Sequence, residues 1–221
     1  MSHLHLPDGI LPWWLWAGGL AITIGLLLPA LRKLETRRRM LPAVAVMAAV
    51  ALVAMNIPLG LPLHLNLAAL AGIVLGPIFG FLAVFVVNLF NMLVSHGGVT
   101  MLGINTILVG SEALIAGGIF GVLGGAKRLA LNSALSVLAA LLVSTLLVVG
   151  VAGVAGVELE ALAGHDHSRH PDGEAGESGF MATFLKIIAP LAAVWMVLEL
   201  TLTLLVVGYI NKVKGGWFAR E

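Results

Sequence analysis

Long apolar runs separated by short polar segments make up most of this chain. Each run is predicted to be a helix, because a bilayer tolerates no lipid-exposed strand edge and the residues do not alternate as in a membrane barrel. The predicted spans are Leu11–Leu31, Leu41–Met55, Leu65–Gly76, Ile78–Val94, Thr106–Leu123, Leu129–Val157 and Phe184–Ile210. We therefore predict an all-α, polytopic membrane protein with a single transmembrane domain over residues 1–221.

The third run, Leu65–Gly76, is too short to cross a bilayer unaided. Its 12 residues extend only about 18 Å as a helix, against a hydrocarbon core of roughly 30 Å. The run is either a re-entrant segment or a seventh span, which must be sheltered by its neighbours or extended past Pro77. The distribution of positive charge favours the seventh span, because cytoplasmic segments are enriched in lysine and arginine.

With seven spans and the N-terminus outside, ten of the 12 basic residues lie on the cytoplasmic side. They are Arg32, Lys33, Arg37, Arg38, Arg39, Lys127, Arg128, Lys212, Lys214 and Arg220. Only Arg169 and Lys186 lie outside. We thus predict seven transmembrane helices, an extracytoplasmic N-terminus and a cytoplasmic C-terminus.

The composition agrees with a membrane protein and limits its chemistry. The chain is 60% hydrophobic and 10% charged, with a mean hydropathy of +1.06. A soluble domain has roughly 25% charged residues. There are no cysteines, which excludes disulfides and thiolate metal ligands. The first apolar run is not a cleavable signal peptide, because no basic segment precedes it.

All seven histidines fall on the predicted extracytoplasmic side of the membrane. They are His3, His5, His64, His96, His165, His167 and His170. Histidine is the commonest side-chain ligand of transition metals, so this one-sided distribution predicts metal capture. The last three lie in an extracytoplasmic loop over 158–180 that is rich in histidine and acidic residues. They either gather metal or are ordinary solvated residues of a loop.

Residues 1–10 form a predicted metal-binding arm outside the membrane. A histidine close to a free amine can chelate a metal through the amine, deprotonated backbone amides and the imidazole, in a near-square-planar geometry that suits Ni(II) and Cu(II). With Met1 present, the amine, two amides and His3 fill four positions. After removal of Met1, the Ser2 amine and the amide and ring of His3 fill three, and His64 is the candidate for the fourth. The alternative is a disordered polar terminus.

Three segments resemble motifs of the CbiM/NikM family. These proteins are the substrate-binding membrane subunits (S components) of energy-coupling factor (ECF) transporters for cobalt and nickel. Residues 5–12, HLPDGILP, resemble the HxPDGxLxP start of the family. The order N-I-P at 56–58, H-L at 64–65 and L-G-P at 75–77 is similar to a second motif, and GGVTMLGIN at 97–105 is similar to the GGxTxLGxN loop. The resemblance covers about residues 3–125.

By motif, the resemblance implies that the terminal amine, His5 and His64 bind the ion. Here, however, four residues precede His5, so His3 keeps the expected distance to the amine while His5 keeps the motif. Alternate residues of an extended arm point the same way, so both could meet one ion. His96, just before Gly97, occupies a position at which the family often has an acidic residue, and it could add a further ligand. The predicted metal residues are therefore Ser2, His3, His5, His64 and His96.

The resemblance also implies the function and the partners. The protein would capture Co²⁺ or Ni²⁺ outside the cytoplasmic membrane of a prokaryote and deliver it inward, as a multi-pass subunit of an ATP-driven importer. Expected partners are a transmembrane coupling (T) subunit, cytoplasmic ATPase subunits, often a small accessory membrane subunit, and membrane lipid. Neither nucleic acid nor a cofactor other than the transported ion is expected.

The chain lacks the motifs of an enzyme. The stretch Gly121–Lys127 does not end in the GK[ST] of a nucleotide-binding loop, and no HExxH is present. The alternatives are a self-contained secondary transporter or channel, and a membrane metal sensor or metalloenzyme. A secondary transporter would need an ionisable relay across the membrane, for which only Glu112 and Glu199 are available.

Glu112 and Glu199 lie within predicted spans, where a carboxyl group is costly and is a functional candidate by default. We favour a structural role for Glu112, paired with Asn88 or Asn91. Asn105 is expected to shape the loop at 97–103 through side-chain to backbone hydrogen bonds.

Overall fold

The computed structural model describes residues 9, 11–56, 65–94, 98–155 and 177–219, and this part of the chain contains helices and no strand. Its seven α-helices are α1 (Trp13–Thr36), α2 (Leu41–Asn56), α3 (Ala68–Leu75), α4 (Pro77–Leu93), α5 (Leu102–Val122), α6 (Leu129–Ala155) and α8 (Glu177–Val213). Three 3₁₀ turns accompany them, namely η1 (Arg38–Met40), η2 (Gly125–Arg128) and η3 (Trp217–Ala219). The all-α prediction is confirmed for the described residues.

Five helical stretches are long and apolar enough to cross a membrane. They are Trp13–Thr36, Arg38–Asn56, Leu102–Val122, Leu129–Val151 and Ala193–Val213. Helix α4 is apolar but has only 17 residues, and α3 has eight. Within the described residues, five helices therefore have the length and composition of a span, and the expectation of seven stays a prediction.

The third predicted span differs most from the sequence-based expectation. Leu65–Leu67 are not helical, and α3 ends at Leu75 without continuing past Pro77. Gly76 breaks the helix with φ 86° and ψ 163°, a backbone conformation that favours glycine, and Pro77 then starts α4. The chain thus turns sharply between α3 and α4.

Two glycines show how tightly α3 and α4 fold against each other. A Cβ on Gly80 would lie 2.7 Å from the Cα of Gly72. In one straight helix these two residues would be about 12 Å apart, because each residue advances the axis by about 1.5 Å. The two helices therefore form a close hairpin around Gly76, and small residues permit the contact.

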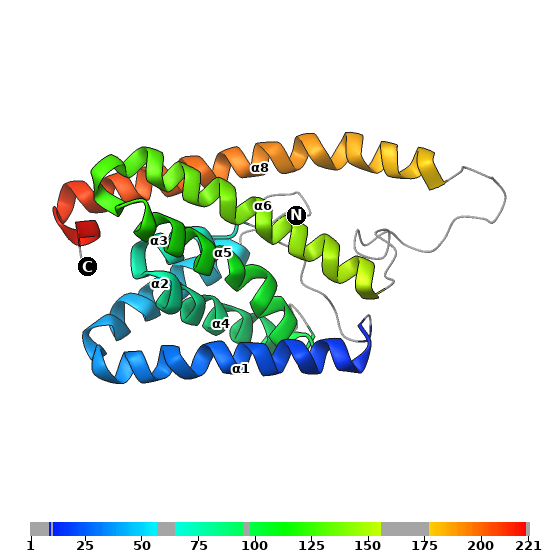
Figure 1. Cartoon of the computed structure of the whole chain (residues 1–221), viewed down its shortest axis with the longest axis horizontal. Coiled ribbons are helices and arrows are strands. Elements are labelled where there is room, and N and C mark those ends of the chain that lie inside the picture. Colours follow the sequence, from blue (N-terminus) through cyan, green and yellow to red (C-terminus); the bar gives the residue numbers. More distant parts are fainter. Residues whose placement is uncertain (1–8, 10, 57–64, 95–97, 156–176, 220–221) are drawn as a thin grey trace.

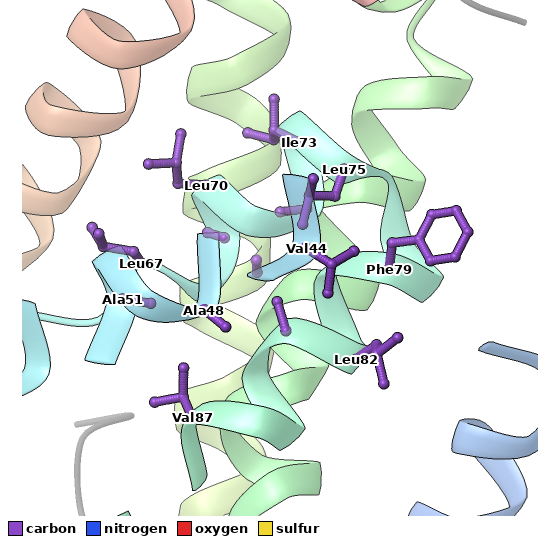
Figure 2. Close-up of a cluster of buried hydrophobic side chains, with 14 of the residues drawn as sticks. Val44, Ala48, Ala51, Leu67, Leu70, Ile73, Leu75, Phe79, Leu82 and Val87 are labelled. Carbon is purple, nitrogen blue, oxygen red and sulfur yellow. The ribbon is translucent and has the colours of Figure 1, made fainter. Parts of the chain in front are cut away.

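Helices α3 and α5 occupy the interior of the bundle. Ala68–Ile73 and Leu75 are buried, so the short α3 is sheltered by its neighbours as expected. A Cβ on Gly117 of α5 would lie 2.5 Å from the carbonyl oxygen of Gly72. Figure 2 shows the core around this hairpin, with labelled side chains from α2, α3 and α4, among them Val44, Leu70 and Phe79.

The outer helices expose apolar side chains, as expected for helices that face lipid. In the part of α8 whose side chains are described, from Ala193 to Val213, every fourth residue from Trp195 to Val207 is buried, and the residues between them are exposed or half-buried. The buried residues are Trp195, Glu199, Thr203 and Val207. One narrow ridge of α8 therefore faces the bundle, and this ridge is partly polar.

The two ends of the bundle differ in charge. At one end α1 and α8 finish and the C-terminus lies nearby; at the other end α1 and α8 begin (Figure 1). The first end has the basic residues of the predicted cytoplasmic segments, all exposed where they are described. They are Arg32, Lys33, Arg37, Arg38, Arg39, Lys127, Arg128, Lys212 and Lys214.

Aromatic side chains at this basic end contact the C-terminal turn η3 and the turn between α3 and α4. The indole Nε1 of Trp217 donates a hydrogen bond to the carbonyl oxygen of Val74, at 3.0 Å. Phe218 packs edge-on against Phe120, with ring centroids 5.7 Å apart. The ammonium of Lys33 lies 5.9 Å from the ring centre of Phe79. The turn between α3 and α4 therefore reaches the basic end, even though α3 is helical for only eight residues.

Candidate functional site

The predicted metal residues Ser2, His3, His5, His64 and His96 lie outside the described residues, as do the three histidines of the 158–180 loop. Among the residues that the structure does describe, no group of three or more histidine, aspartate or glutamate side chains could hold a metal ion. What the structure describes is the framework from which the histidine-bearing segments extend.

The base of the N-terminal arm packs against the start of α5. Leu11 is buried in an apolar cluster with Met101, Ile104 and Leu108 and with Val148 near the end of α6. Residue 9 is a glycine with φ 89°, consistent with the turn that proline, aspartate and glycine at 7–9 predict. Leu11, which follows the arm, therefore meets the start of α5 and the last third of α6 at one end of the bundle.

The ends of α2 and α4 are joined at this same end by polar side chains. The Nδ2 of Asn56 donates to the Oδ1 of Asn91 at 3.3 Å, and Asn91 donates to the Sδ of Met55 at 2.8 Å. One turn earlier on α4, Asn88 donates to the Oγ1 of Thr106 on α5, also at 3.3 Å. These contacts fix the points from which the segments 57–64 and 95–97 extend.

A third anchor lies deeper, where the chain enters α3. The Nδ2 of Asn66 donates to the Oε2 of Glu112 at 2.8 Å, and the Oδ1 of Asn66 accepts from the backbone N–H of Ala68 at 2.9 Å. Asn66 is 2% exposed and Glu112 is completely buried. Glu112 is the central residue of α5, which runs from Leu102 to Val122, so this contact lies about midway along the helix.

Glu112 is paired with an asparagine, as expected of a structural carboxyl, and one such partner is Asn66, which the prediction did not name. Asn88 bonds to Thr106 and Asn91 bonds to α2, whereas Glu112 accepts from Asn66. Sequence reasoning did not single out Asn66. The signal was present, because an asparagine just before an apolar helix commonly accepts a hydrogen bond from a backbone N–H of the first turn.

The loop motif at 97–105 is partly helical. The backbone N–H of Met101 donates to Gly98, and α5 begins at Leu102 rather than at Thr106 as predicted. Gly103 lies against α1, where a Cβ would be 2.5 Å from the Cα of Leu20, and its carbonyl accepts from the Oγ1 of Thr23 at 2.8 Å. Asn105 accordingly lies in the first turn of α5, directly after the loop that it is expected to shape.

Glu199 brings a second carboxyl group into the interior. It is 1% exposed on the inner ridge of α8, close enough to Glu112 for the two carboxyls to interact electrostatically. The hydroxyls of Thr203, one turn further along α8, and of Ser133 on α6 are buried and bond to none of the described residues. Buried polar side chains therefore occur among the apolar core residues of α5, α6 and α8.

Comparisons with known proteins give a family and a fold. The family model CbiM, "Cobalt uptake substrate-specific transmembrane region", matches residues 5–217. A structure described as a truncated transition metal transporter is 21% identical with a TM-score of 0.64, and the match covers 95% of this chain and 99% of that chain. A second, described as a transition metal transporter, is 23% identical with a TM-score of 0.63, covering 95% and 93%. At these identities the structures show the fold alone. No curated protein matches the sequence.

Proposed function

Since this chain belongs to the CbiM family of cobalt uptake substrate-specific transmembrane proteins, we propose that it binds Co²⁺ or Ni²⁺ on the extracytoplasmic side and delivers the ion inward. It acts as the substrate-specific subunit of an ATP-driven ECF importer in the cytoplasmic membrane of a prokaryote. Membership of the family and the shared fold support transport, whereas the choice of metal and the energy source are parts of this proposal.

One structural observation carries the location of the site. Described residues next to the histidine-bearing segments contact α5: Leu11 packs against Met101 and Asn88 bonds to Thr106 near its start, and Asn66 bonds to Glu112 at its middle. Segments that start from one end of a bundle can contribute ligands to one ion. We assign the ligands to His3, His5 and His64 with the terminal amine of Met1 or Ser2, and place His96 beside them.

We propose that the energy comes from other subunits, since the sequence has no nucleotide-binding loop. We propose a transmembrane coupling subunit, cytoplasmic ATPase subunits and often a small accessory membrane subunit. The exposed basic residues at the opposite end of the bundle, such as Arg37 and Arg128, suit contact with anionic lipid headgroups.

Metal binding by the purified chain tests the ligands. We expect one Ni²⁺ or Co²⁺ per chain, measured by metal analysis, with an absorption spectrum typical of a square-planar Ni²⁺ complex. His64→Ala and either His3→Ala or His5→Ala should reduce the metal content. Full occupancy in all three single variants would contradict the assignment, and a spectrum unchanged only in His3→Ala would assign the arm's ligand to His5.

A self-contained transporter is the second candidate, because Glu112 and Glu199 are two interacting carboxyls within the bundle. Uptake into cells that express the chain with and without the partner subunits separates the two functions. We expect rapid uptake only with the ATPase and coupling subunits. Full-rate uptake by the chain alone, abolished by Glu112→Gln, would support the self-contained transporter instead.

A further inference from the structure

The C-terminal turn η3 folds back over the basic end of the bundle. Gly216 has φ 89°, a conformation that favours glycine, and it lies just after α8 ends at Val213. The half-buried rings of Trp217 and Phe218 then reach the inner helices, since the first bonds to Val74 of α3 and the second packs against α5. The turn η3 therefore connects the end of α8 with the ends of α3 and α5.

Four basic residues surround this turn, and all four are exposed. Lys212 lies at the end of α8 and Lys214 just after it, where its ammonium is 5.1 Å from the ring centre of Trp217. Lys127 and Arg128 belong to η2, which contacts η3. None of the acidic residues that the structure describes is in η2, in η3 or at the end of α8. Like charges around one short turn repel one another, because salt screens charges mainly beyond about 8–10 Å.

Exposed apolar side chains lie beside these cations. Val122 and Leu123 are exposed at the end of α5, shortly before η2, and Tyr209 and Val213 are exposed on the last part of α8. Cations next to exposed apolar side chains match a phospholipid, whose phosphate meets the charges while its acyl chains cover the apolar surface. A soluble anion would use the charges alone and leave the apolar side chains uncovered.

We propose that η2, η3 and the end of α8 form a binding site for one anionic phospholipid of the leaflet that borders the basic end. Its phosphate neutralises the cations on both sides of η3 and so holds this turn against the ends of α3 and α5. The site goes beyond the proposed transport function and does not involve the metal ligands. It also goes beyond a general attraction of the basic end for anionic headgroups, because η3 brings together the cations of two separate elements.

The test is lipid binding by the full-length protein in detergent, measured by native mass spectrometry. We expect one dioleoyl phosphatidylglycerol per chain at concentrations at which the zwitterionic dioleoyl phosphatidylcholine does not bind. A basic residue near a membrane surface strengthens anionic lipid binding about fivefold, so Lys212→Gln with Lys214→Gln should weaken phosphatidylglycerol binding about 10-fold or more. The pair Lys127→Gln with Arg128→Gln should have a similar effect. Equal binding of the two lipids by the wild type would overturn the proposal.

Arg37→Gln with Arg38→Gln is the matched control, because it removes the same charge from exposed residues at the same end of the bundle. Phosphatidylglycerol binding by this pair should match that of the wild type. A loss as large as in the pair at Lys212 and Lys214 would reduce the effect to the net charge of the basic end and contradict a defined site.

Protease protection tests the site in the wild-type protein, without relying on the folding of any variant. Phosphatidylglycerol should slow cleavage of the C-terminal segment, because bound lipid holds η3 in place, and phosphatidylcholine should not. Glycerol 3-phosphate at the same concentration should neither protect the segment nor displace the lipid. Absence of protection by phosphatidylglycerol would overturn the proposal, and equal protection by glycerol 3-phosphate would replace the lipid with a soluble anion.

Discussion

Gly117 and Gly118 are neighbours on α5 that face very different surroundings. A Cβ on Gly117 would lie 2.5 Å from the Gly72 oxygen and 2.7 Å from the Pro77 nitrogen, whereas a Cβ on Gly118 would meet nothing within 4 Å. Backbone atoms cannot move aside as the tip of a side chain can, so Gly117→Ala should cost about 1–3 kcal/mol or more. We expect its unfolding midpoint to fall by roughly 5–10 °C in thermal unfolding experiments.

Gly118→Ala is the control for this substitution. Alanine is favoured over glycine within a helix by up to about 1 kcal/mol, so this variant should be as stable as the wild type or slightly more stable. Equal destabilisation by both substitutions would contradict the close approach of α3 and α5.

At the residue scale, the sequence pointed to individual residues such as Glu112, but it did not identify the residues that they contact. Glu112 was predicted to be a structural carboxyl, but its partner is 46 positions away on a stretch with no helical pattern. Periodicity describes one element at a time and says nothing about which polar residues of separate elements meet. The predicted ligands from Ser2 to His96 lie outside the described residues, so they remain predictions.

The short turn η3 holds the C-terminal segment against the hairpin formed by α3 and α4. Its Trp217 bonds to Val74 and lies under the ammonium of Lys214, 5.1 Å from the ring centre. Trp217→Phe keeps an aromatic ring but removes the N–H donor, so it should destabilise this contact by about 1 kcal/mol. Protease should therefore cleave the C-terminal segment of the variant faster.

Tyr209→Phe serves as the control, because Tyr209 is an exposed aromatic residue of α8. Its cleavage rate should match that of the wild type. Equal cleavage of Trp217→Phe and the wild type would show that the hydrogen bond to Val74 does not hold the segment.

At the element scale, the long helices were predicted well and the short one was not. Unbroken apolar runs determine helices such as α1 and α6, whose starts differ from the prediction by two residues at most. The bounds of helix α3 are set by Gly76, by the non-helical Leu65–Leu67 and by the helices that pack around it. Hydropathy does not distinguish an apolar helix from an apolar segment whose backbone is satisfied by another element.

The orientation of the whole molecule can be tested with single cysteines, because the native chain has none. Val99 is 67% exposed at the end from which the histidine-bearing segments extend, and Val122 is 89% exposed at the basic end. In intact cells, a membrane-impermeant maleimide should label Val99→Cys, and it should label Val122→Cys only after lysis. The opposite result would reverse the predicted topology.

At the scale of the whole molecule, the distribution of charge favours an arrangement that hydropathy leaves open, and this topology stays a prediction. Placing the basic residues on one side required the third run to cross the bundle, and the contact of Val74 with Trp217 brings its end to the basic side. The described part of this run is an eight-residue helix with a non-helical approach, which no span-length rule anticipates.

Helix α3 is also too short to be recognised as a span by the machinery that inserts nascent chains. Asn66 in the non-helical Leu65–Leu67 meets Glu112, and Gly72 packs against Gly117, only once α5 has been synthesised. We therefore expect the hairpin of α3 and α4 to settle late, after the ribosome has delivered α5. Biogenesis of this protein thus places the segment next to His64 last among the first five helices.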